Sequence, residues 1–139
     1  MNSHLFKLAR EEMMKSTYDD GSRRLGCLVV LKGTIISRGH NTRKTHTQQK
    51  IYNRYRFNDH NLCKYAPLAH AETNALNRIR FLDRKALEQV EIYIYREYVD
   101  GSPALARPCK SCMEYIKKLG IRTIYYTTSD GFAEEKLTY

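Results

Sequence analysis

The chain has 139 residues, 42% of them hydrophobic, and carries a formal net charge of +9. This length fits one compact domain over residues 1–139, and the apolar content is too high for a disordered chain. No run of about 18 apolar residues occurs, which argues against a membrane span. Residues 1–16 lack the apolar stretch of a secretory signal, so we expect a cytoplasmic protein with no membrane partner.

Residues 3–16 are predicted to form an amphipathic helix. Apolar side chains recur every four residues and would share one face of that helix: Leu5, Ala9 and Met13. Ser3 is a residue type that caps helix N-termini.

A β-hairpin is expected next. Two short apolar runs, residues 27–31 and 34–37, flank residues 32–33, whose glycine suits a tight turn. The polar connection that follows, roughly residues 41–67, is long enough to suggest a functional loop.

The second half of the chain alternates helices and strands. Pro67 precedes a predicted helix over residues 68–79, and residues 90–95 alternate as a strand does. A further helix is expected over residues 109–119 and a strand over residues 121–127. This order predicts an α/β fold with a mixed sheet and helices on its faces.

The four cysteines are interpreted as reduced thiols or metal ligands, because no secretory signal precedes them: Cys27, Cys63, Cys109 and Cys112. Cys27 has the setting of a buried strand residue. Cys109 and Cys112 are separated by two residues at a helix start, where both sulfurs can bind one cation. With His70 they would give zinc three ligands and leave a fourth position for water, as in catalytic zinc sites.

Glu72 lies two residues beyond His70, near the expected metal but not as a ligand. There its carboxylate can take a proton from the water and deliver it to a leaving amine. Taken separately, the Cys-x-x-Cys pair could be redox-active or half of a structural zinc site, and His-Ala-Glu could be an ordinary helix start. Their combination, each at a helix start, favours the catalytic interpretation.

These motifs, His70-Ala-Glu72 and Pro108-Cys-Lys-Ser-Cys112, resemble the signature of the cytidine/deoxycytidylate deaminase superfamily. The resemblance extends from about residue 16 to residue 128. Within it, residues 26–41 are similar to the first hairpin of deoxycytidylate-type deaminases. Residues 106–126 are similar to small deaminase-like proteins of phages and large viruses.

The resemblance implies a three-layer α/β fold: a central mixed sheet of about five strands, helices on both faces and one zinc between two helix starts. It implies that Asn41 hydrogen-bonds the sugar or base of the substrate and that the backbone N–H of Ala71 holds the pyrimidine carbonyl. It further implies a homo-oligomer. Deoxycytidylate deaminases usually follow their Asn with a Gly-Ser-Pro-like loop, where this chain has Thr-Arg-Lys-Thr-His over residues 42–46. The resemblance therefore carries over the reaction class and not the substrate.

Positive charge gathers between residues 38 and 64, where seven cations and one anion leave a net charge of +6. Such a concentration suggests a phosphate-bearing partner, and it is also compatible with a solvated face. Arg43, Lys44 and His46 follow Asn41 and would stand at the pocket mouth. There they could bind a substrate phosphate or be ordinary exposed loop cations.

Three further features have more than one interpretation. Residues 52–57 interleave aromatics with arginines and could bind a single strand, or could cover the core as an amphipathic element. His46, His60 and Cys63 could hold a second zinc, although no fourth ligand is evident. Tyrosines on the predicted strands are interpreted as structural, some of them at a subunit contact.

Three functions remain under consideration. The first is zinc-dependent hydrolytic deamination of cytosine to uracil on a free nucleotide or nucleoside, with the basic loop favouring a phosphorylated substrate such as deoxycytidylate. The second applies the same chemistry to a base in single-stranded DNA or RNA. The third is a zinc-stabilised binding module, which has no need of a proton-transferring Glu72.

Overall fold

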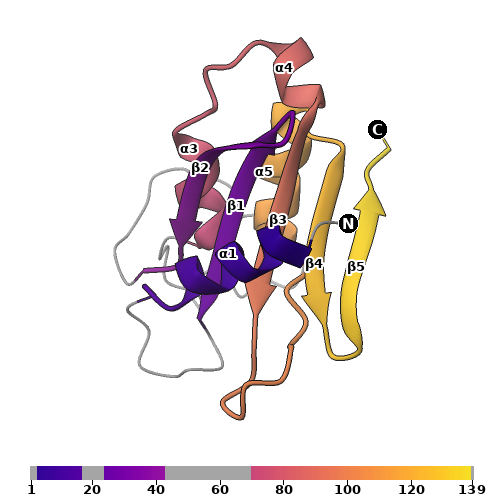
Figure 1. The fold of residues 1–139 in the computed structure, drawn as a ribbon. Helices are drawn as coiled ribbons and strands as arrows, with labels where there is room; N and C mark the ends of the chain where they lie inside the picture. The colour runs from indigo at the N-terminus through magenta and orange to yellow at the C-terminus, as the bar shows by residue number, and fades with distance from the viewer. Residues whose placement is uncertain (1–2, 17–23, 43–69, 139) are drawn as a thin grey trace, which may run out of the picture.

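The computed structural model describes residues 3–16, 24–42 and 70–138 (Figure 1). The helices and strands follow one another in this order: α1 (Ser3–Met13), β1 (Leu25–Leu31), β2 (Thr34–His40), α3 (Ala71–Asn77), α4 (Arg84–Glu88), β3 (Val90–Arg96), α5 (Lys110–Leu119), β4 (Thr123–Thr128) and β5 (Gly131–Lys136).

The strands form one mixed sheet in the order β2-β1-β3-β4-β5. Strands β3 and β4 pair in parallel, whereas the other neighbours are antiparallel. Helix α1 covers one face of the sheet, and α3 and α5 lie on the other (Figure 1). This three-layer arrangement confirms the α/β fold with a mixed sheet that the sequence predicted.

Strand β1 separates two apolar cores. Cys27 and Val29 join the core beneath α3 and α5, whereas Leu28 and Val30 join the core beneath α1. Because side chains alternate along a strand, a strand covered on both faces must be apolar almost throughout. This requirement explains the continuous run LGCLVVL and the burial of Cys27.

Two glycines let helices lie directly on the hairpin backbone. A Cβ at Gly39 would lie 2.5 Å from the backbone nitrogen of Ala75 and 2.6 Å from the carbonyl oxygen of Ala71, both in α3. A Cβ at Gly26 would overlap the backbone of α1 at Ala9 and Met13. Since real Cβ atoms do not approach backbone this closely, the glycines set how near α3 and α1 lie to the sheet.

Most expected elements are present in the described residues. The expected hairpin turn is tight, with Lys32 at φ 51° and Gly33 at φ 82°, as a type I′ turn requires. Helix α3 begins at Ala71 in the structure with His70 as its N-cap, and the first two positions of its predicted span, 68 and 69, lie outside the described residues. Helix α4 and strand β5 were not predicted.

The helices of residues 3–16 and 70–138 are all too short or too polar to cross a membrane.

Candidate metal centre and active site

Three metal-binding side chains meet where α3 and α5 begin. His70 is the N-cap residue of α3, Cys109 is the N-cap of α5, and Cys112 follows in the first turn of α5. Strands β2 and β3 both run antiparallel to β1, so they end at the same edge of the sheet. Gly39, near the end of β2, lies against Ala71 at the start of α3, and residues 97–109 join the end of β3 to α5. Both helix starts therefore lie at this end of the sheet.

The distances between these side chains fit a zinc ion. Nδ1 of His70 lies 3.6 Å from Sγ of Cys109 and 3.3 Å from Sγ of Cys112, and the three donor atoms lie within 4.8 Å of one another. Ligands held at 2.0–2.3 Å around a tetrahedral zinc are about 3.5–3.8 Å apart. Two sulfurs and one imidazole are also the donor types that zinc prefers over harder divalent cations.

The two cysteines differ in acidity. Hydrogen bonding from Cys112 lowers the pKa of Cys109 to about 3. Burial opposes this shift, whereas hydrogen bonds from His70 and Ser111 add to it. The same interaction with Cys109, together with burial, raises the pKa of Cys112 well above its ordinary value. One thiolate therefore forms readily, whereas the second forms when a bound cation balances the charge.

Each sulfur also has a buried hydroxyl beside it. Oγ of Ser111 lies 3.0 Å from Sγ of Cys109, and Oγ1 of Thr73 lies 3.8 Å from Sγ of Cys112. Ser111 is fully buried and Thr73 is 2% exposed. A metal-bound thiolate can only accept hydrogen bonds, so both hydroxyls would donate to it. The sequence analysis did not find either residue.

Glu72 lies in the first turn of α3, two residues after the candidate ligand His70. It is 3% exposed, and its Oε1 has no hydrogen-bond partner among residues 3–16, 24–42 and 70–138. Burial raises the pKa of this carboxyl, and the nearby His70 opposes the rise. A buried carboxyl of this kind suits a proton carrier.

Asn41 and Ala71 lie where the end of β2 meets the start of α3, Asn41 just after the strand and Ala71 in the helix. Asn41 follows the last residue of β2 and is 4% exposed. Its Oδ1 accepts hydrogen bonds from the backbone N–H of Leu25 at 2.9 Å and from the hydroxyl of Ser16 at 2.7 Å. Ala71 is the first residue of α3, where backbone N–H groups have no acceptor within the helix.

The remaining expected site residues lie outside the described part of the chain. These are the phosphate-loop residues, the second zinc ligands and the aromatic-basic segment: Arg43, Lys44, His46, His60, Cys63 and residues 52–57.

Comparison with protein families gives the class of this protein. The family model described as "Cytidine and deoxycytidylate deaminase zinc-binding region" matches residues 1–128. The chain therefore belongs to the cytidine and deoxycytidylate deaminase family and is a zinc-dependent hydrolytic deaminase. His70, Cys109 and Cys112 are its candidate zinc ligands. A search of curated proteins found no match.

Solved structures share the fold at low sequence identity. Cytidine deaminase from Burkholderia pseudomallei is 15% identical, with a TM-score of 0.63 over 98% of this chain and 92% of that chain. The dCMP deaminase of cyanophage S-TIM5 in apo form is 21% identical, with a TM-score of 0.54 over 91% of this chain and 84% of that chain. The same phage enzyme in complex with dCMP and dUMP is 20% identical, with a TM-score of 0.54 over 89% and 78%.

Proposed function

We propose that this protein converts cytosine to uracil on a free nucleoside or nucleotide, with a deoxycytidylate-like monophosphate as the preferred substrate. The observation that carries the proposal is the buried Glu72 carboxyl beside three candidate zinc ligands, with an Oε1 that none of the described residues hydrogen-bonds. A binding module would have no use for such a carboxyl, since leaving a buried acceptor unpaired costs free energy.

The reaction consumes one water: the bond from C4 to the exocyclic amine breaks, a carbonyl forms at C4, and ammonia leaves. Zinc, when held by His70, Cys109 and Cys112, would supply a water of lowered pKa. Glu72 takes up a proton at its carboxylate and later returns one to the departing amine. Its burial keeps bulk water from competing for that proton.

The substrate would be positioned by groups on both sides of the contact between β2 and α3. The backbone N–H of Ala71 would donate to the pyrimidine carbonyl, and Asn41 would bind the sugar or base. Arg43, Lys44 and His46 would bind a phosphate, which the net charge of +6 over residues 38–64 supports. The phage dCMP deaminase with the same fold was solved with dCMP and dUMP, which also supports a monophosphate.

A second candidate substrate is a cytosine or other base in single-stranded DNA or RNA. The positive charge of residues 38–64 and the aromatic-arginine pattern of residues 52–57 favour it. A polynucleotide substrate would make the affinity fall steeply with salt, in proportion to the phosphates contacted.

We also propose that the protein is cytoplasmic, that the chain is one domain, and that it works as a homo-oligomer. Light scattering of the purified protein tests the assembly: a mass of one chain would contradict it.

The function is tested by measuring ammonia release from cytidine, deoxycytidine, their mono- and triphosphates, and a cytosine-containing oligonucleotide. We expect the highest kcat/KM for a monophosphate and uracil as the product base. Turnover of the oligonucleotide alone would establish the second candidate, and no release from any of them would contradict the proposal.

A further inference from the structure

Asn41, which the proposed function assigns to substrate binding, is held by Ser16, three residues after the end of α1. Oγ of Ser16 lies 2.7 Å from Oδ1 of Asn41 and 3.0 Å from its carbonyl oxygen, so the single hydroxyl proton is shared between them. The N–H of Leu25 donates to the same Oδ1. The Leu25 N–H can only donate, so it requires the oxygen and not the nitrogen of the carboxamide to face it, and the Ser16 hydroxyl adds a second hydrogen bond to that oxygen.

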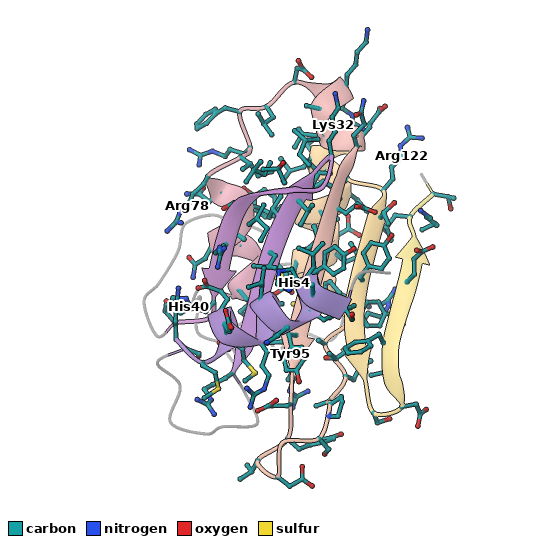
Figure 2. All side chains as sticks on the ribbon, in the orientation of Figure 1. His4, Lys32, His40, Arg78, Tyr95 and Arg122 are labelled. Carbon is teal, nitrogen blue, oxygen red and sulfur yellow. The ribbon has the colours of Figure 1, made fainter. Side chains whose placement is uncertain are left out.

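The preceding residue, His40, is held by the same helix. Its Nδ1 lies 2.6 Å from Oε2 of Glu12, and Nζ of Lys15 lies 3.4 Å from the other carboxylate oxygen. Glu12 is only 4% exposed, so its contact with the end of β2 is buried. Figure 2 shows His40 at that end of the strand, beside α1. The last turn of α1 thus contacts the side chain of His40 through Glu12, and Ser16, three residues after the helix ends, contacts the side chain of Asn41.

Helix α3 holds the same pair from the other face of the sheet. Nδ2 of Asn74 donates to the carbonyl oxygen of His40 at 2.7 Å. The same helix begins at the zinc ligand His70. Contacts therefore run from α1 through His40 and Asn41 to the helix that carries the metal ligand, and they place Asn41 relative to the reacting centre.

We propose that Ser16 is a positioning residue that sets substrate affinity by orienting the Asn41 carboxamide; this inference rests on the proposed function of Asn41. Without the hydroxyl, Oδ1 loses one of the two donors described above, and the carboxamide is held less firmly in the orientation that binds substrate. Ser16 contacts neither the metal ligands nor Glu72 in the hydrogen bonds described above. Its loss should therefore weaken binding and leave the proton transfers unchanged.

The test compares Ser16→Ala, Ser16→Cys and Ser16→Thr, with Met14→Ala as a control at an exposed side chain of the same helix end. The substrate is whichever cytosine nucleoside or nucleotide the wild type turns over best. We expect Ser16→Ala to raise KM about three- to tenfold, as one lost hydrogen bond does, with kcat within about twofold of wild type. Threonine should restore KM, cysteine should give an intermediate value because its S–H is a weak donor, and Met14→Ala should match wild type.

The same serine variants are then measured in an Asn41→Ala background. If Ser16 acts through Asn41, Ser16→Ala adds no further increase in KM there. A KM increase that persists in this background, or a loss of kcat with unchanged KM, overturns the inference. If Ser16→Ala does not fold, a wild-type KM for Ser16→Cys overturns it equally.

The failure of the proposed function would look different. An active enzyme whose KM is unchanged by Asn41→Ala removes Asn41 from substrate binding, and this inference falls with it. A wild type that releases no ammonia from any cytosine compound refutes the proposed function itself, whatever Ser16 does.

Discussion

Glu72 carries a buried oxygen that no residue in the described part of the chain hydrogen-bonds, an arrangement that costs free energy unless the oxygen bonds water or substrate. We expect Glu72→Gln, which keeps the shape of the side chain, to retain zinc and the fold. Turnover should fall by about 10²–10⁴-fold, because the amide cannot carry a proton. Zinc is measured by elemental analysis and turnover by ammonia release. Glu88→Gln on α4 is the control, and a Glu72→Gln variant with more than about a tenth of wild-type activity would exclude the proposed role.

The hydroxyls beside the two sulfurs should support zinc binding to different degrees. Ser111 lies 3.0 Å from Sγ of Cys109, whereas Thr73 lies 3.8 Å from Sγ of Cys112. Groups that hydrogen-bond metal ligands typically contribute about 10–100-fold in metal affinity. We expect Ser111→Ala to release zinc to a chelator at least about tenfold more readily than wild type, and Thr73→Val to have a smaller effect.

The control for this prediction is Ser102→Ala, which removes a hydroxyl that bonds Asp100 in an exposed loop. Equal zinc release from wild type, Ser111→Ala and Ser102→Ala would show that the hydroxyl near Cys109 does not support the metal site.

Among the helices and strands, those with a locally repeating burial pattern were predictable from the sequence. The four-residue spacing of Leu5, Ala9 and Met13 predicted α1, and all three are buried. Strand β5 was not predicted, because its sequence GFAEEK is polar and its burial alternates only between partial and full exposure. Its place in the sheet depends on pairing with β4, which no local pattern encodes.

The candidate site likewise contains residues that could be predicted from the sequence and contacts that could not. His70, Cys109 and Cys112 were predicted from residue type, spacing and the family signature, and the structure brings them together, whereas the role of Glu72 stays a prediction. Contacts such as Ser16 with Asn41 or Glu12 with His40 join residues more than twenty positions apart. Nothing in either segment indicates its partner, because the contact depends on α1 lying across β2 in the folded protein.

The close contacts of α3 with Gly39 and of α1 with Gly26 allow the roles of the two helices to be compared by one alanine variant at each glycine. A Cβ at Gly39 would press on backbone atoms of α3, and a Cβ at Gly26 on backbone atoms of α1. Forcing extra volume into packed sites typically costs about 1–3 kcal/mol, so both alanine variants should unfold at lower denaturant concentration. Only Gly39→Ala should weaken zinc binding, because α3 carries His70. Weaker zinc binding in Gly26→Ala, or none in Gly39→Ala, would contradict this assignment of the two helices.

The stability of the whole molecule should depend on the metal. The ligands come from two separate helices, so a bound zinc joins α3 to α5 and binds the folded chain more tightly than the unfolded one. We expect removal of zinc by a chelator to lower Tm, and added zinc to restore it. Cys109→Ala should lower Tm even with zinc present, whereas Cys27→Ala, at a buried cysteine that is not one of the three candidate ligands, should keep the response to zinc. An identical Tm with and without chelator would exclude a stabilising metal.

The distribution of charge over the molecule decides between the two substrate classes. If the substrate is a nucleotide, removing Arg43 and Lys44 should raise KM for the monophosphate and leave the nucleoside nearly unchanged. A charged hydrogen bond of this kind is worth about 1.5–3 kcal/mol, or roughly 10–150-fold in kcat/KM.

If the substrate is a polynucleotide, the loss of Arg54 and Arg56 should reduce kcat/KM to a comparable degree. Each lost phosphate contact should then reduce the slope of log affinity against log salt concentration by about 0.7–0.9. The experiment measures kcat/KM for nucleoside, monophosphate and oligonucleotide at two salt concentrations, for the two double alanine variants and for Lys117→Ala/Lys118→Ala, which removes the same charge from the end of α5. Small, equal effects of all three variants on every substrate would mean that residues 38–64 are a solvated surface and bind no phosphate.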